Sequence, residues 1–136
     1  MIEGGCLCGA VRYKILAEPI VMRACWCRVC QFIAAGNATI NLAFPRDAIA
    51  ITGELHDYVS TADSGRHMHR RFCPACGTPM FSEAEERPHL IIVRAGTLDD
   101  PAIVVPDAVI WAAQAPSWAR IDPSIARFEG QPPPVA

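Results

Sequence analysis

Seven cysteines stand in three short groups whose spacing is that of metal ligands. In an extended segment the side chains at positions i and i+2 point to the same face, so Cys6 and Cys8 can approach one ion. A C-x-x-C turn brings Cys73 and Cys76 together by folding back, and Gly77 gives the backbone the freedom that such a turn often needs. The middle group consists of Cys25, Cys27 and Cys30.

This set of thiols favours zinc as the bound metal. Closed structural zinc sites use four protein ligands, whereas catalytic sites use three and keep one position open. Seven thiolates divide into four and three, which predicts two zinc ions per chain. Cysteines that serve only as small buried apolar residues would need no such spacing. Thiolate sites also accept iron, so the residues alone leave the identity of the metal open.

The spacing alone allows two ways to divide the ligands. In a zinc-ribbon arrangement the two C-x-x-C pairs share one ion, and the remaining three thiols form the open site. In the other arrangement the first and third groups share the closed site and the middle group forms the open one. Locality favours the second division, because three ligands close together in the chain cost little loop-closure entropy to gather. The ribbon would use Cys27, Cys30, Cys73 and Cys76, with Cys6, Cys8 and Cys25 at the open site.

Three segments, GGCLCGAVRY at 4–13, CWCRVCQ at 25–31 and FCPACGTPMF at 72–81, carry a family resemblance. They resemble the glutathione-dependent formaldehyde-activating enzyme family, whose domain centromere protein V shares. The resemblance extends to the FEGQP segment at 128–132. Three ordered cysteine motifs together are far more specific than a single C-x-x-C pair.

The resemblance implies a small β-tent fold stabilised by zinc. It implies that the enzyme combines glutathione with formaldehyde to give S-hydroxymethylglutathione, which is a carbon-sulfur lyase reaction when read backwards. It also implies which thiols share an ion. The structural zinc would be held by Cys6, Cys8, Cys73 and Cys76, and the catalytic zinc by Cys25, Cys27 and Cys30.

The sequence departs from the family pattern at several polar positions. The middle motif usually reads Cys-His-Cys, but Trp26 stands between these thiols here. Ala35 replaces a small hydroxyl residue before the glycine. Towards the C-terminus the family commonly has a His and a Ser-Lys pair, where this chain has Ala108 and Ala113-Gln114. These replacements bear on the choice of substrate and leave both metal sites intact.

Polar residues near the cysteine groups are further candidates for binding. Three thiolates on a divalent ion leave a net charge of about −1, which Arg23 or Arg28 could offset, although both also fit a solvated surface. Gln31 either orients a bound ligand or caps a turn. Trp26 is expected to form an apolar wall beside the site.

The segment 66–71 carries two histidines and three arginines. His67 or His69 could give the open site a fourth ligand, but exposed strand histidines are commoner. Arg66, Arg70 and Arg71 could meet the carboxylates of a glutathione-like peptide, since guanidinium groups match carboxylates well. The alternative is a solvated edge strand.

Short segments rich in Val, Ile, Thr and aromatic residues, separated by Gly and Pro, predict a mostly β protein. A short helix is expected over 28–36, ending at Gly36, and a turn over 99–102. The predicted strands are 10–16, 20–24, 38–42, 48–52, 54–58, 67–72, 80–83 and 90–95.

The composition, with 51% hydrophobic and 19% charged residues, predicts one domain over 1–131 with a Pro-rich tail at 132–136. No apolar run is long enough to predict a membrane span. The formal net charge of −2 argues against a nucleic-acid partner. The N-terminal segment 1–5 lacks the features of a signal peptide, and unpaired thiols suit a reducing compartment, so a cytoplasmic location is expected.

Two functions are consistent with these residues. The first is a zinc enzyme that adds glutathione, or a related thiol, to a small aldehyde such as formaldehyde. The second is a non-catalytic module that binds a partner on the same zinc-stabilised scaffold. The replaced polar positions favour the second function, and the three-thiol group favours the first.

Overall fold

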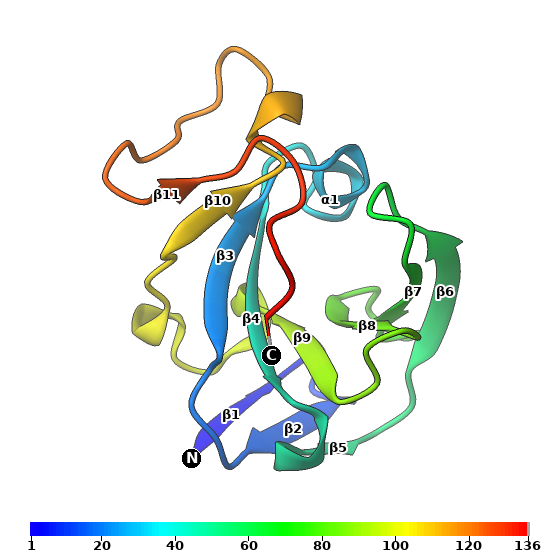
Figure 1. Cartoon of the computed structure of the whole chain (residues 1–136). Helices are drawn as coiled ribbons and strands as arrows, with labels where there is room; N and C mark the ends of the chain where they lie inside the picture. Colours follow the sequence, from blue (N-terminus) through cyan, green and yellow to red (C-terminus); the bar gives the residue numbers. More distant parts are fainter. Residues whose placement is uncertain (136) are drawn as a thin grey trace.

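The computed structural model describes residues 1–135, and strands dominate it (Figure 1). The α-helix of this part of the chain, α1 (Arg28–Ile33), is short. Four 3-10 turns connect the strands, at Arg46–Ala48, Ala95–Thr97, Pro101–Ile103 and Ala112–Gln114. The prediction of a mostly β domain is confirmed. No helix among the described residues is long and apolar enough to span a bilayer.

A small antiparallel sheet holds the first cysteine group. It has the order β1-β2-β5, with β1 at Ile2–Gly5, β2 at Arg12–Ile15 and β5 at Ile49–Thr52. Along β2 the residues alternate, so that Tyr13 and Ile15 are buried while the charged residues between them are exposed. This alternation is what one buried face of a sheet requires.

A larger sheet forms the rest of the domain, with the order β11-β10-β3-β4-β9-β8-β7-β6. The strand β10 runs parallel to β3 and β11, and the other neighbours are antiparallel. The strands are β3 (Val21–Cys25), β4 (Thr39–Pro45), β6 (His56–Thr61), β7 (His67–Phe72), β8 (Pro79–Ala84), β9 (Leu90–Arg94), β10 (Ala108–Ile110) and β11 (Ala126–Arg127).

The main core contains apolar side chains from both sheets. The rings of Tyr13 and Phe81 meet edge to face, with their centroids 5.3 Å apart. The Tyr13 hydroxyl is also within 2.8 Å of Thr97 Oγ1, so this buried polar group is satisfied. A second, smaller cluster forms around Trp26, Val109 and Ala112.

All eight predicted strands overlap observed ones, with shifts at their ends. The largest correction is at 54–58, because β6 begins only at His56 and continues to Thr61. The predicted helix is also too long: α1 ends at Ile33, and Ala35 and Gly36 then take the left-handed conformation with φ of 56° and 104°. The strands β1, β10 and β11 were not predicted.

The C-terminal segment folds back onto the larger sheet. In Figure 1 it runs beside β4 and ends near β9. Pro132 is buried, and the Arg87 guanidinium donates a hydrogen bond to the Val135 carbonyl. The division into a domain at 1–131 and a tail at 132–136 stays a prediction, and Ala136 lies outside the described residues.

Candidate metal centres and the cavity beside them

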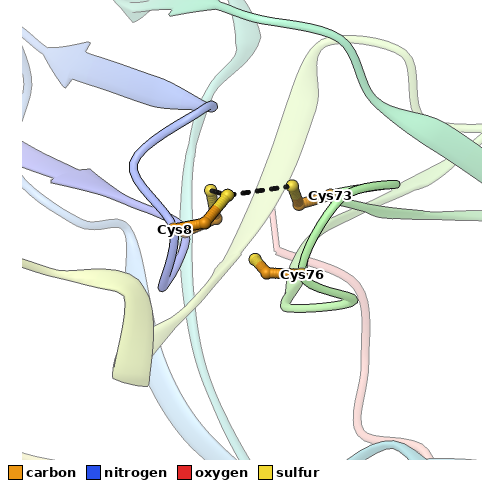
Figure 2. Close-up of side chains that lie close together, drawn as sticks. Cys8, Cys73 and Cys76 are labelled. Atoms are coloured by element: carbon orange, nitrogen blue, oxygen red, sulfur yellow. Dashed lines mark hydrogen bonds between the residues drawn. The ribbon is translucent and has the colours of Figure 1, made fainter.

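The first and third cysteine groups meet between the two sheets. Cys6 and Cys8 lie in the loop after β1, and Cys73 and Cys76 lie in the turn between β7 and β8. Figure 2 shows that the sulfurs of Cys8, Cys73 and Cys76 point toward one another from these two loops. All four sulfurs lie within 4.8 Å of one another. The cluster therefore joins the small sheet to the large one.

The geometry of this cluster fits a tetrahedral zinc ion. Zinc–sulfur bonds of about 2.3 Å place neighbouring sulfurs about 3.8 Å apart in a tetrahedron. The Cys6 and Cys8 sulfurs are 3.6 Å apart, and the Cys8 and Cys73 sulfurs are 3.8 Å apart. Backbone and hydroxyl groups support the ligands as well, since the Val11 amide donates to Cys6 Sγ over 3.3 Å.

Hydrogen bonds at the third group stabilise a thiolate. The Thr78 side chain lies 3.1 Å from Cys76 Sγ, and its hydroxyl oxygen accepts a bond from the Leu7 amide. Thr78 is the main cause that lowers the pKa of Cys76 to about 5. A thiol that ionises this readily is a good metal ligand at neutral pH.

The middle group gathers at the end of β3 and the start of α1. Cys25 is the last residue of β3, and Cys27 and Cys30 lie three apart on the first turn of α1, where side chains share a face. Their sulfurs, with that of Cys25, lie within 4.8 Å of one another. The Cys30 amide donates to Cys27 Sγ over 3.3 Å and so caps the helix.

The three thiols of the middle group influence one another's protonation. Hydrogen bonds from Cys25 and then Cys27 lower the pKa of Cys30. Hydrogen bonds with Cys27 and then Cys30 raise the pKa of Cys25. Without a cation the group therefore keeps protons, which a divalent ion would displace on binding.

The structure thus brings the first and third cysteine groups together and keeps the middle group apart, which is the second of the two predicted divisions. The zinc-ribbon grouping of Cys27 and Cys30 with Cys73 and Cys76 is not found among the described residues. Both clusters offer only thiols, the donors that zinc prefers in such sites. Whether each holds zinc stays a prediction.

A cavity of about 190 Å³ opens beside the middle group and not beside the closed one. Its floor is the face of the larger sheet opposite the main core. Gln131, Pro133, Pro134 and Val135 of the C-terminal segment form part of its wall. The sulfur-bearing residues that line it are Cys25, Cys27, Cys30 and Met68.

Arg94, on β9, is a site residue that the sequence did not reveal. It lines the cavity and is only 9% exposed. Burial lowers the pKa of this guanidinium, while the nearby thiolates, Cys30 foremost, act to raise it. A guanidinium stays protonated in proteins, so Arg94 places a positive charge beside the three thiols. Only the pairing of β4 with β9 could have revealed it.

The candidates within the middle motif have structural roles. Trp26 is 3% exposed and packs against Trp118 in the second apolar cluster, and it does not line the cavity, so the apolar wall beside the site stays a prediction. The Gln31 amide donates to the carbonyls of Trp26 and Gln114, over 2.8 and 3.0 Å. It therefore ties the turn to the segment around Gln114. Arg28 is exposed and donates to Gln31 Oε1 over 2.6 Å.

The segment 66–71 divides its residues between two faces of the sheet. Arg66 and Arg70 line the cavity, whereas Arg71 lies on the other side near Asp57 and Glu83. The edge-strand prediction is wrong, because β7 lies between β6 and β8.

The two histidines of that segment lie away from the middle cysteine group. His67 bonds to Glu86, and His69 bonds to Asp57 and Glu85. Neither histidine lines the cavity, so neither is placed to be a fourth ligand there.

Known proteins fit this arrangement. Residues 1–114 match the family described as glutathione-dependent formaldehyde-activating enzyme. The chain belongs to this family. A Halomonas elongata protein, provisionally named a glutathione-dependent formaldehyde-activating enzyme, is 27% identical over 128 residues, covering 90% of this chain and 82% of that protein.

A solved structure is similar in fold to this chain. The crystal structure of a Rhodobacter sphaeroides protein superposes with a TM-score of 0.57 at 17% identity. The match covers 93% of this chain and 98% of that one. At this identity the likeness concerns the fold alone.

Proposed function

We propose that this chain is a zinc-dependent enzyme of the carbon-sulfur lyase class, which adds glutathione or a related thiol to a small aldehyde such as formaldehyde. The observation that carries the proposal is the position of the three-thiol group. Cys25, Cys27 and Cys30 line the cavity, whereas the four-thiol group lies between the sheets. An open three-ligand site facing a cavity is what a catalytic zinc requires.

The residues around the cavity would have distinct roles. Cys25, Cys27 and Cys30 would hold zinc, which supplies a Lewis acid and a vacant position for a thiolate or a carbonyl oxygen. Arg94 offsets negative charge from the thiolates. Trp26 packs with Trp118 and Val109 in the second apolar cluster and would hold the backbone between Cys25 and Cys27 in place. In the overall reaction the thiol sulfur bonds to the carbonyl carbon, and the thiol proton ends on the carbonyl oxygen.

The test uses Cys27→Ser, because Cys27 is only half-buried and lies at the end of a helix. Carbon-13 formaldehyde and glutathione are mixed with protein, and exchange NMR gives the rate of adduct formation above the spontaneous rate. We expect Cys27→Ser to lose one zinc per chain and all enzymatic acceleration while its melting temperature stays close to that of the unchanged protein.

Phe32→Ala is the matched control for this experiment. Phe32 lies on the same helix but is 78% exposed and does not line the cavity. It should keep both zinc ions and the full rate. A Cys27→Ser protein that lost the zinc and kept the acceleration would contradict the proposal.

One observation favours the second candidate, a non-catalytic binding module. Gln114, which stands where the family resemblance leads us to expect a Lys, is tied into the structure. Its side chain accepts a bond from the Arg28 amide over 2.7 Å and donates to Asp63 over 3.3 Å. The binding module predicts that the zinc-loaded chain gives no acceleration with any pair of thiol and aldehyde.

A further inference from the structure

Three arginines form a row on the floor of the cavity. In the register of the large sheet, Arg23 on β3 lies opposite Asn41 on β4, which lies opposite Arg94 on β9. Residues that face each other across strands project on the same side of a sheet. Arg70 on β7 lies one step along the sheet from this register, because it pairs with Ser82, which pairs with Ile92. All three arginines line the cavity.

Among the described residues, these arginines lack carboxylate partners, as do Arg66 and Arg87 at the cavity wall, whereas some other arginines are paired. Arg12 and Arg46 each pair with a carboxylate, at distances of 2.5 and 3.1 Å. Within residues 1–135, no ion pair includes Arg23, Arg70 or Arg94. Their cationic charge is thus available to a ligand that enters the cavity.

Their hydrogen-bonding capacity is also incompletely used. Arg94 donates from Nη1 to Asn41 Oδ1 over 2.6 Å, and Arg70 donates from Nη1 to Ser60 Oγ over 2.7 Å. The Nε atoms of Arg23 and Arg94 are buried with no hydrogen-bond partner. Buried donors of this kind normally have partners, so an unpaired pair beside a cavity points to an absent acceptor.

The acidic residues at the cavity wall are engaged elsewhere. Glu83 lies 3.1 Å from Arg46, and Asp63 accepts a bond from Gln114. A three-thiolate zinc site would carry a net charge of about −1, which one guanidinium balances. Two further positive charges in the row would then stay unbalanced. The cavity therefore suits an anionic ligand.

We propose that Arg23, Arg70 and Arg94 form a subsite for the carboxylate of the thiol substrate. This inference rests on the proposed function and specifies the thiol. Arg23 and Cys25 are two residues apart on one strand, which places their Cα atoms roughly 6.6 Å apart along it. The substrate is therefore a thiol with a carboxylate only a few bonds from its sulfur. A cavity of about 190 Å³ holds a part of that size.

The test compares 3-mercaptopropionate with its neutral amide, 3-mercaptopropionamide, by calorimetric titration of the zinc-loaded protein. Both probes offer the same thiol, so their difference isolates the carboxylate. Hydrogen bonds to charged groups contribute about 1.5–3 kcal/mol, so we expect the acid to bind about 10- to 100-fold more tightly. Arg70→Gln and Arg23→Gln should each reduce that ratio to within a few-fold of unity.

Arg94→Lys tests the buried member of the row with its charge retained. Arg127→Gln is the matched control, because Arg127 is exposed on β11 and pairs with Glu129. It should leave the ratio unchanged, whereas Arg94→Lys should lower it. Circular dichroism establishes that each variant is folded before it is titrated.

Several results would overturn the subsite: equal binding of acid and amide, an equal loss in Arg127→Gln, or stronger competition by inorganic phosphate than by propionate. Failure of the proposed function looks different. In that case the acid still binds in an arginine-dependent way, but no aldehyde adduct forms faster than in buffer. If instead the acid and the amide react with the aldehyde equally fast, and faster than in buffer, the proposed enzyme function is supported and the carboxylate subsite is wrong.

Discussion

At the scale of single residues, Gly4 shows how closely β1 is packed just before the loop that carries Cys6 and Cys8. A Cβ atom at this position would overlap the Thr97 carbonyl oxygen and the Tyr13 hydroxyl, two buried groups that do not move freely. We expect Gly4→Ala to destabilise the protein by about 1–3 kcal/mol, as overpacking usually does. Urea denaturation measures this, with Gly96→Ala as the control because a Cβ there meets nothing within 4 Å. Equal stabilities of the two variants would refute the overlap.

At the scale of elements, His69 joins three neighbouring strands at the end of the large sheet. Its ring lies on β7 and bonds to Asp57 on β6 and to Glu85 just after β8. These bonds, that to Asp57 first, raise the pKa of His69 above its ordinary value of 6.5. The contribution of the charged ring to stability is therefore fully present below pH 6.5 and is lost as the pH rises through the raised value.

His69→Gln should consequently lower the melting temperature more at pH 6 than at pH 9. Thermal melts at both values check this, with His89→Gln as the control because no ion pair among the described residues includes His89. If the difference in melting temperature between His69→Gln and the unchanged protein were larger at pH 9 than at pH 6, the charged His69 ring would not be the stabilising group.

The elements also show what the sequence could predict. The strand at His67–Phe72 was predicted with its observed ends, because its alternation is local. The strands β10 and β11 were missed, since they are only three and two residues long. Moreover, β10 pairs with β3, which is far away in the chain, and β11 pairs only with β10. The spacing of the cysteine motifs left two groupings open, and the short chain distances within the middle group, together with the family resemblance, favoured the observed one. The arginine row did not, because it exists only through the register of β3, β4 and β9.

At the scale of the whole molecule, the closed cysteine group connects two sheets that share one core. Cys6 and Cys8 come from the small sheet, and Cys73 and Cys76 come from the large one. The binding energy of a structural zinc is folding energy, about 10–16 kcal/mol in zinc-finger peptides. That is as large as the net stability of a typical domain, about 5–15 kcal/mol. A zinc held here would accordingly decide whether the two sheets pack.

The two cysteine groups should therefore respond differently to the same substitution. Cys73 is fully buried, and we expect Cys73→Ser to abolish cooperative unfolding at 25 °C, as judged by near-ultraviolet circular dichroism. Cys27→Ser removes a ligand from a group that lies at the end of β3 and does not join the two sheets, so this variant should still unfold cooperatively, with a slightly lower melting temperature. Metal analysis by plasma mass spectrometry should find one zinc in Cys27→Ser. If Cys73→Ser melted like the unchanged protein, hydrophobic packing alone would hold the two sheets together. The prediction of a structural zinc at the closed cysteine group would then be wrong.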